Sequence, residues 1–190
     1  LRLGVGDPTI MDALARVHLK EFKEKNPAIV KAVQEDKAHA KKDEDEMERK
    51  IQLKLREQIE AKYNIHSDLG HIAELLAEKG LTGLEEIEME PGVPIRPTLA
   101  ERLPSSKEII EKLGKCMVEA KMDGFRLQVH KNGKQVKIFS RNQENMTDMF
   151  PEIVLAAAEQ LDAQKCIVEG EALAYNEKLQ EFFPFQVTIQ

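Results

Sequence analysis

A lysine, an Asp-Gly pair and an arginine lie close together in residues 119–126. Lys121 follows a short apolar run, Asp123 and Gly124 are typical of a turn, and Arg126 opens an alternating run. A lysine becomes a covalent nucleophile once its ammonium loses a proton, which a partly desolvated pocket or neighbouring cations favour. The spacing therefore makes Lys121 a candidate nucleophile. The alternative is a plain β-turn that contains a lysine.

Further charged residues follow on segments that we expect to be neighbouring strands. Arg141 lies at the end of one such segment, and Glu169 and Glu171 lie within a later one. Arginines suit phosphate and ribose contacts, whereas carboxylates suit an amino group, a sugar hydroxyl or a divalent cation. Two arginines and three carboxylates, Glu119 included, would then surround one lysine.

The second half of the chain contains mostly strand-like runs that could position these residues. Residues 125–129 and 136–138 alternate apolar and polar types around Asn132-Gly133, which predicts a hairpin with a type I′ turn. A capping-box pattern at Ser105 predicts a short helix that ends at Gly114. We also expect strands at 116–120, 166–174 and from 182 to 187, and a helix at 151–161 with Ile153, Val154 and Ala157 facing inward.

The first half reads as helices. Asp7 is expected to be an N-cap. In the helix that follows, one face is expected to contain Ile10, Leu14 and Val17, with Met11, Ala15 and Phe22 close beside it. Residues 36–63 are highly charged but repeat apolar side chains every four positions, at Met47, Ile51, Leu55 and Ile59. Such a stripe fits a partner or membrane helix; packing on its own domain is favoured because such stripes are common. Another helix is expected at 69–79, closed by Gly80.

The composition and a stretch rich in proline and glycine indicate two folded domains. The chain has 190 residues, a formal net charge of −6 and 42% apolar residues, which is typical of folded domains. Three prolines and a glycine fall within residues 91–97, so we place a boundary between residues 90 and 91. The start at Leu1 and the end in an apolar run suggest a piece of a longer protein.

Several functional classes receive no support. No run approaches the roughly 18 apolar residues of a membrane span, and no signal peptide pattern is present. Cys116 and Cys166 are expected to be buried and reduced, and the histidines lack metal-ligand spacing. The acidic balance argues against binding nucleic acid by bulk charge, although a local basic face remains compatible with it.

Taken together, these motifs resemble ATP-dependent DNA ligases of the archaeal and eukaryotic replicative type. Residues 119–126 resemble motif I of the nucleotidyltransferases, 139–147 motif Ia and 168–172 motif III, where Glu169 stands in place of the usual aspartate. Residues 91–100 resemble the linker into the adenylation domain, 1–6 with the next helix resemble the end of a helical DNA-binding domain, and 184–186 resemble the segment after motif III.

The resemblance implies an α+β chain. An all-α remnant of the DNA-binding domain at 1–90 would precede the first part of an adenylation domain with antiparallel sheets at 91–190. It also implies that Lys121 takes AMP from ATP, that Glu119 accepts from the adenine amino group, and that Arg126 and Arg141 contact ribose and phosphate. Glu171 would bond the ribose or help to bind Mg²⁺. Asp123 and Gly124 would shape the turn.

The resemblance also implies the partners. Nicked double-stranded DNA would be the substrate, a sliding clamp is a candidate protein partner, and a monomer is expected without any membrane association. The setting would be intracellular, cytoplasmic in a prokaryote or nuclear in a eukaryote. This chain alone is not expected to seal nicks. The alternatives are an RNA ligase, an mRNA capping guanylyltransferase, an NAD-dependent ligase or a non-catalytic DNA-binding module.

Overall fold

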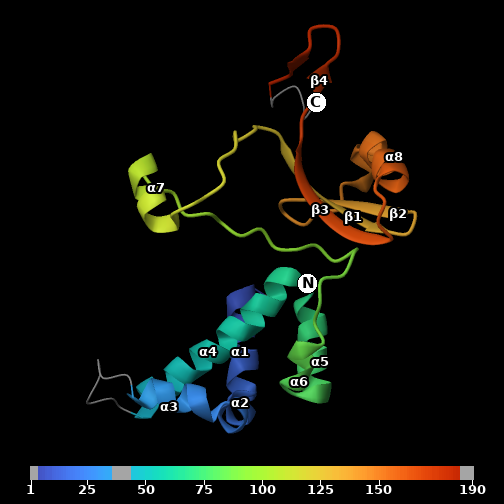
Figure 1. The fold of residues 1–190 in the computed structure, drawn as a ribbon. Helices are drawn as coiled ribbons and strands as arrows, with labels where there is room; N and C mark the ends of the chain where they lie inside the picture. The colour runs from blue at the N-terminus through green and yellow to red at the C-terminus, as the bar shows by residue number, and fades with distance from the viewer. Residues whose placement is uncertain (1–3, 36–43, 185–190) are drawn as a thin grey trace. The chain divides into compact units, whose positions relative to one another are not determined.

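The computed structural model describes residues 4–35 and 44–184, and it divides into two units (Figure 1). The units are Leu1–Arg96 and Pro97–Gln190, each with its own hydrophobic core. The division therefore lies between residues 96 and 97, at the end of the proline-rich stretch, and not between 90 and 91. The expected features at residues 1–3, 36–43 and 185–190 lie outside the described residues.

The first unit is helical throughout its described part. Its helices are α1 (Asp7–Val17), α2 (Leu19–Lys25), α3 (Pro27–Glu35), α4 (Glu44–Ile65), α5 (Leu69–Lys79) and α6 (Thr82–Glu85). Gly80 follows α5 with a φ of 61°, a left-handed conformation that glycine adopts without steric cost. The expected bounds of this helix and its glycine stop are confirmed.

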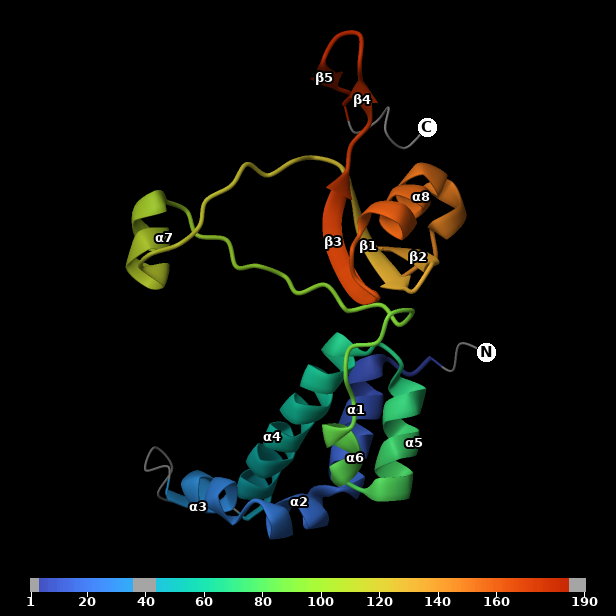
Figure 2. The ribbon, with the colours of Figure 1, turned by 45° about the vertical axis from the view of Figure 1, so that its right-hand side comes forward.

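The long helix α4 packs on its own domain. Its stripe of Ile51, Leu55, Ile59 and Tyr63 is buried, and Leu55 and Ile59 are fully inaccessible to solvent. These side chains join one core with residues of α1, α2 and α5. Figure 2 shows the backbones of these helices grouped with α4 in the first unit. The favoured interpretation of the charged helix is confirmed for residues 44–65: its polar face is solvated, and its apolar stripe forms the centre of the unit.

Helix α1 differs from expectation in two ways. Gly6 is the N-cap and Asp7 is the first helical residue, so the predicted cap was wrong by one position. Met11 and Ala15 are the buried side chains, whereas Val17 is 75% exposed. Positions 11 and 15 are buried in place of 10 and 17 because this face of α1 packs on α4, and the buried stripe continues at four-residue spacing into Leu19 of α2.

Residues 91–96 belong to the helical unit because Arg96 is tied to it. The Arg96 amide donates to the Asn64 carbonyl at 2.9 Å, and its guanidinium lies 3.0 Å from the Asp7 carboxylate and 4.4 Å over the Tyr63 ring. The Tyr63 hydroxyl donates to the same carboxylate at 2.7 Å. Burial, followed by this bond to Asp7, raises the pKa of Tyr63.

The second unit combines helices with antiparallel sheets, as expected. Its elements are α7 (Ser106–Leu113), β1 (Phe125–Asn132), β2 (Gln135–Ser140), the 3₁₀ turn η2 (Thr147–Met149), α8 (Pro151–Gln160), β3 (Lys165–Ala172), β4 (Tyr175–Asn176) and β5 (Glu181–Phe182). Ser105 caps α7 by accepting from the Glu108 amide at 3.3 Å. The predicted N-cap at Ser105 and the glycine stop of α7 are thus confirmed, and the Glu108 carboxylate accepts from the Ser105 hydroxyl at 3.0 Å.

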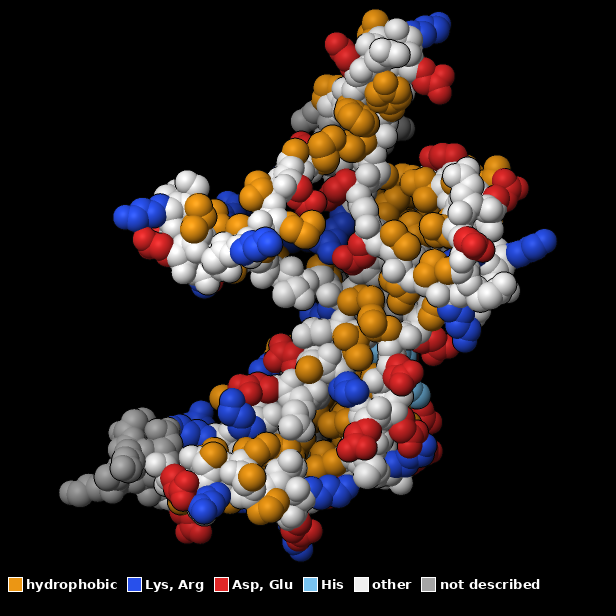
Figure 3. Space-filling view, viewed as in Figure 1, with side chains coloured by type: hydrophobic (Ala, Val, Ile, Leu, Met, Phe, Trp, Pro, Cys, Tyr) orange, Lys and Arg blue, Asp and Glu red, His pale blue; other side chains and the backbone are white. Residues whose placement is uncertain are grey.

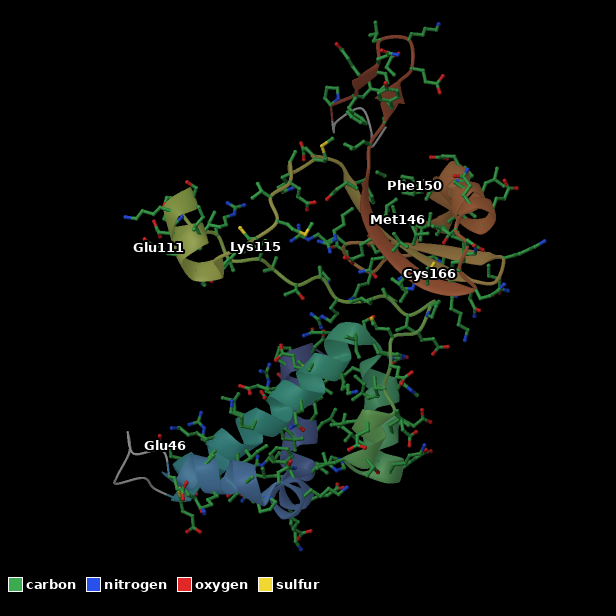
Figure 4. All side chains as sticks on the ribbon, viewed as in Figure 1. Glu46, Glu111, Lys115, Met146, Phe150 and Cys166 are labelled. Carbon is green, nitrogen blue, oxygen red and sulfur yellow. The ribbon has the colours of Figure 1, made fainter. Side chains whose placement is uncertain are left out.

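The main sheet has three strands in the order β2-β1-β3, with both pairs antiparallel. Helix α8 covers one face, and hydrophobic side chains gather between it and β3 (Figure 3). The core on this face contains Leu127, Ile138 and Ala157, and Met146 and Phe150 pack against it (Figure 4). Strand alternation therefore turns Arg126, Gln128, Glu169 and Glu171 to the opposite face.

The predicted hairpin is confirmed, but its turn is shifted by one residue. Asn132 and Gln135 are the last paired residues, so Gly133 and Lys134 form the turn. Gly133 has a φ of 60°, whereas Lys134 is not among the residues with positive φ. A glycine at the first central position is the pattern of a type II′ turn, so the type I′ assignment was wrong.

The expected strand at residues 116–120 is absent from the described structure. Val118 is 90% exposed, and the segment has no regular structure. A short apolar run alone does not make a strand, because a strand also needs a ladder partner for its backbone groups.

Neither cysteine is buried as expected. Both are free thiols, with Cys116 exposed and Cys166 half-buried. Cys116 lies in the segment that lacks a ladder partner, and Cys166 lies on β3, which has a paired neighbour on one side only in the described sheet. Within residues 4–35 and 44–184, no helix is long and apolar enough to cross a bilayer.

Candidate active site

A hollow in the second unit brings most of the predicted site residues together. Glu119, Lys121, Arg126 and Glu171 all line it. Its volume is about 730 Å³, within the range of roughly 300–1,000 Å³ that is usual for small-ligand pockets. Acidic and basic side chains mix in this region, between β3 and the chain leading to β1 (Figure 3).

The strand register explains how β1 and β3 contribute to the hollow. Arg126 of β1 stands opposite Glu171 of β3, and Gln128 stands opposite Glu169. All four therefore share the sheet face away from α8. The Arg126 Nη2 atom lies 2.6 Å from the Glu169 carboxylate, which makes a diagonal ion pair between the two strands.

Gly124 is needed because β3 approaches it closely. A Cβ atom at this position would lie 2.6 Å from the Ala172 carbonyl oxygen and 2.9 Å from the Leu173 Cδ2. Gly124 forms a bend, and residues 121–123 before it have no regular structure. The glycine between Lys121 and Arg126 thus lets the chain enter β1 tight against its neighbour, in keeping with a shaping role.

Arg141 does not line the hollow. It is an exposed residue of the loop after β2, and β1 separates that strand from β3, so the two outer strands are about 10 Å apart. The Ser140 hydroxyl holds this loop by accepting from the amides of Asn142 and Glu144, each at 3.2 Å. The structure thus fixes the loop that carries Arg141, but the Arg141 side chain does not reach the hollow that the four other predicted site residues line.

Lys121 is exposed in this structure. We expected a strand at 116–120 to end just before this lysine and a partly desolvated pocket to surround its amine, and both expectations were wrong for the described residues. The reason is the same as for residues 116–120, because the preceding segment has no ladder partner that would hold it against the sheet. Lys121 contributes to one wall of the hollow and leaves its amine accessible.

Some parts of the hollow were not singled out from the sequence. These are the linker residue Ala100 and the apolar side chains of Met122 and Leu173. Glu169 was expected among the three carboxylates around the lysine but without a specific contact; it lines the hollow because two-residue alternation along β3 places it on the same face as Glu171. No local pattern indicates Ala100, since its place depends on how the linker folds back.

Behind the charged residues, the same sheet face contains a buried histidine. His130 is 2% exposed, its ring packs edge-on against Phe139 at 4.8 Å, and its Nε2 atom lies 3.2 Å from the Gln128 side-chain oxygen. The pKa of His130 is lowered to about 4, chiefly by burial; Glu169 opposes this shift and Lys137 adds to it.

We expect His130 to make this sheet less stable in mild acid. The unfolded chain protonates near pH 6.5 whereas the folded imidazole stays neutral to about pH 4, so the unfolded state binds the extra proton in between. The free energy of opening the sheet should fall by at most about 2 kcal/mol from pH 7 to pH 5. Amide exchange of β1 in the full-length protein at both pH values measures this change.

The matched variant for that experiment is His130→Gln. Its side chain does not titrate, so the difference between pH 7 and pH 5 should largely disappear, whatever the substitution costs at pH 7. An equal loss of protection in the variant would show that other groups cause the pH dependence.

These features define the class of the protein: a helical unit is followed by an α+β unit in which a lysine, an arginine and carboxylates line one hollow. Comparison with known proteins gives the family. Residues 97–190 match the model of the ATP dependent DNA ligase domain. The second unit therefore belongs to the ATP-dependent DNA ligase domain family.

The whole chain is similar to DNA ligases. It is 44% identical to a probable DNA ligase of Dictyoglomus turgidum over 190 residues, which cover 100% of this chain and 27% of that protein. It is 43% identical to a DNA ligase of Hyperthermus butylicus over 188 residues, which cover 98% of this chain and 26% of that protein. The chain thus spans about a quarter of the length of these relatives.

Among solved structures, the ligase domain of LigD from M. tuberculosis matches 37% of this chain and 23% of its own chain. The sequence identity is 26% and the TM-score is 0.32, which is too low to support a structural argument.

Proposed function

We propose that the protein containing this chain is an ATP-dependent DNA ligase that seals nicks in duplex DNA through a lysyl-AMP intermediate. The observation that carries this proposal is the single hollow lined by Glu119, Lys121, Arg126 and Glu171. It joins one amine, a guanidinium and carboxylates, which are the groups needed to hold a nucleotide and form a bond to its phosphorus.

In the first step, the neutral Lys121 amine attacks the α-phosphorus of ATP. The new N–P bond replaces the bond to the bridging oxygen, pyrophosphate leaves with the electron pair, and the amine gives up a proton. Arg126 donates to the phosphate or ribose, and Glu119 accepts from the adenine amino group. Positioning and charge neutralisation would supply most of the rate enhancement.

The donor set of the hollow suits Mg²⁺ to a limited extent. Mg²⁺ prefers oxygen ligands and commonly binds through one or two carboxylates together with phosphate and water. Glu171 offers such a carboxylate in the hollow, although no group of three or more possible metal ligands occurs among residues 4–35 and 44–184. When bound, Mg²⁺ would neutralise charge on the phosphates.

In the later steps, AMP passes from Lys121 to the 5′-phosphate of the nick, and the 3′-hydroxyl then displaces it. Arg141 would contact the nick phosphate, which agrees with its exposed place in a loop beside the sheet. The helical unit would form part of the DNA-binding domain. Replication, repair and recombination would use the activity inside the cell, with the enzyme as a monomer and a sliding clamp as a protein partner.

The test is nucleotide transfer by the full-length protein, freed of bound AMP with pyrophosphate and then incubated separately with ATP, GTP or NAD. We expect a mass increase of one AMP with ATP only, and sealing of a nicked duplex. Transfer of GMP would instead indicate a capping enzyme, and AMP uptake from NAD the NAD-dependent class. Sealing of RNA but not DNA nicks would indicate an RNA ligase, and no transfer at all a binding module.

A further inference from the structure

The ion pair of Arg126 does not follow the direct pairing of the strands. Glu171 stands opposite Arg126 in the register, yet the guanidinium lies 2.6 Å from Glu169, two residues earlier on β3. Diagonal neighbours on one sheet face have Cβ atoms roughly 7–8 Å apart, a span that two long side chains can bridge. The guanidinium of Arg126 therefore lies toward Glu169 and away from Glu171, and all three residues line the hollow.

This choice of partner leaves Glu171 unengaged. Among residues 4–35 and 44–184, the Glu171 side chain makes no hydrogen bond or ion pair, whereas Glu169 is occupied by Arg126. The two carboxylates share one strand and one sheet face but differ in their neighbours. Glu171 remains available to a ligand, whereas Glu169 holds the guanidinium of Arg126.

Arg126 keeps most of its donors while it is held in this way. A guanidinium has five N–H donors in a planar fork, and the contact with Glu169 is made through Nη2. Both side chains are 38% exposed, so water screens the pair. The contact can therefore fix the orientation of Arg126 before a ligand arrives while leaving donors for phosphate or ribose.

We propose that Glu169 is a positioning residue that orients Arg126 for the incoming nucleotide. The inference rests on the proposed function, because Arg126 must contact the nucleotide for its orientation to matter. Holding a flexible arginine in place before binding reduces the entropy lost on binding. The benefit should therefore appear in the affinity for ATP more than in the rate of the chemical step.

The experiment measures single-turnover AMP uptake by the full-length protein as a function of ATP concentration. Glu169→Gln should raise the ATP concentration at half-maximal rate about 10-fold and leave the maximal rate within about threefold. Glu169→Asp keeps the charge and should recover most of the affinity, because the arginine can follow a shorter partner. Glu159→Gln, on an exposed turn of α8, is the matched control and should behave like the unmodified protein.

A double-substitution cycle tests whether Glu169 acts through Arg126. Arg126→Gln combined with Glu169→Gln should be no worse than Arg126→Gln alone, because nothing remains to orient. If the two losses multiply instead, or if Glu169→Asp is as impaired as Glu169→Gln, the positioning role is refuted. A lower maximal rate at unchanged ATP dependence would also refute it.

The two proposals fail in different ways. If the unmodified protein takes up AMP from ATP but the cycle shows no coupling between Glu169 and Arg126, only the proposed role of Glu169 is refuted. If the unmodified protein takes up no AMP, the proposed ligase function is refuted, and the role of Glu169 is refuted with it.

Discussion

Replacing Lys121 by alanine in the full-length protein is expected to abolish AMP uptake, with a loss of at least about 10⁴-fold in rate. Among the described residues that line the hollow, Lys121 is the only one with an amine. Alanine removes the atom that forms the bond to phosphorus, and water at that position would yield free AMP and no protein adduct. Intact-mass analysis after incubation with ATP measures the change directly.

Lys121→Arg separates the charge of this residue from its nucleophilicity. Arginine keeps the positive charge, but its guanidinium does not lose a proton in proteins, so the variant should be as inactive in AMP uptake as the alanine variant. Lys115→Ala is the matched control, because Lys115 is exposed and does not line the hollow (Figure 4). It should retain the normal rate.

A pre-adenylated nick distinguishes loss of chemistry from loss of structure. Both Lys121 variants should still join such a nick, since the final displacement of AMP by the 3′-hydroxyl does not pass through the lysine. Undiminished AMP uptake by Lys121→Ala would contradict the proposed nucleophile. Failure of the variants on the pre-adenylated nick would indicate that the substitution disturbs the fold.

The sequence predicted those elements whose signals are local. The cap at Ser105, the glycine stops at Gly80 and Gly114, and the turn near Gly133 depend on a few neighbouring residues, and all were found to within one position. Features that depend on distant contacts were less predictable. The buried face of α1 is set by its packing on α4, and residues 116–120 lack the partner that a strand requires.

In the candidate site, too, features with a local sequence signal were predicted, and features that depend on distant contacts were not. The spacing of residues 119–126 and the alternation in β3 place Glu119, Lys121, Arg126 and Glu171 around one hollow. The pairing of Arg126 with Glu169 depends on the register between β1 and β3, which no single segment encodes. The exposure of Lys121 likewise reflects packing around the segment before β1 and could not be read from the motif.

The second large effect is expected at Gly124, where a single added methyl group should loosen the wall of the hollow. A Cβ atom would lie 2.6 Å from the Ala172 carbonyl oxygen, which belongs to the backbone of β3 and cannot rotate away as a side chain would. Gly124→Ala must therefore separate the start of β1 from the end of β3. Overpacking of this kind costs about 1–3 kcal/mol.

Amide exchange in the full-length protein gives the local stability of the β1–β3 pair. Opening of this ladder should become roughly 5- to 150-fold more frequent in Gly124→Ala. AMP uptake should fall by about 100-fold, because small misplacements of reacting groups are costly. Arg126 begins its strand two residues after Gly124 and would move with it.

Gly170→Ala is the matched control for the exchange measurement. Gly170 lies in the middle of β3, has no positive φ, and an added Cβ would meet nothing within 4 Å. Its exchange should match the unmodified protein or be slightly slower, because alanine restricts the unfolded chain more than glycine does. If both substitutions give the same exchange, the close approach at Gly124 does not control the packing of the two strands. If only Gly124→Ala accelerates it, the glycine between the lysine and the arginine is required by the carbonyl of the neighbouring strand.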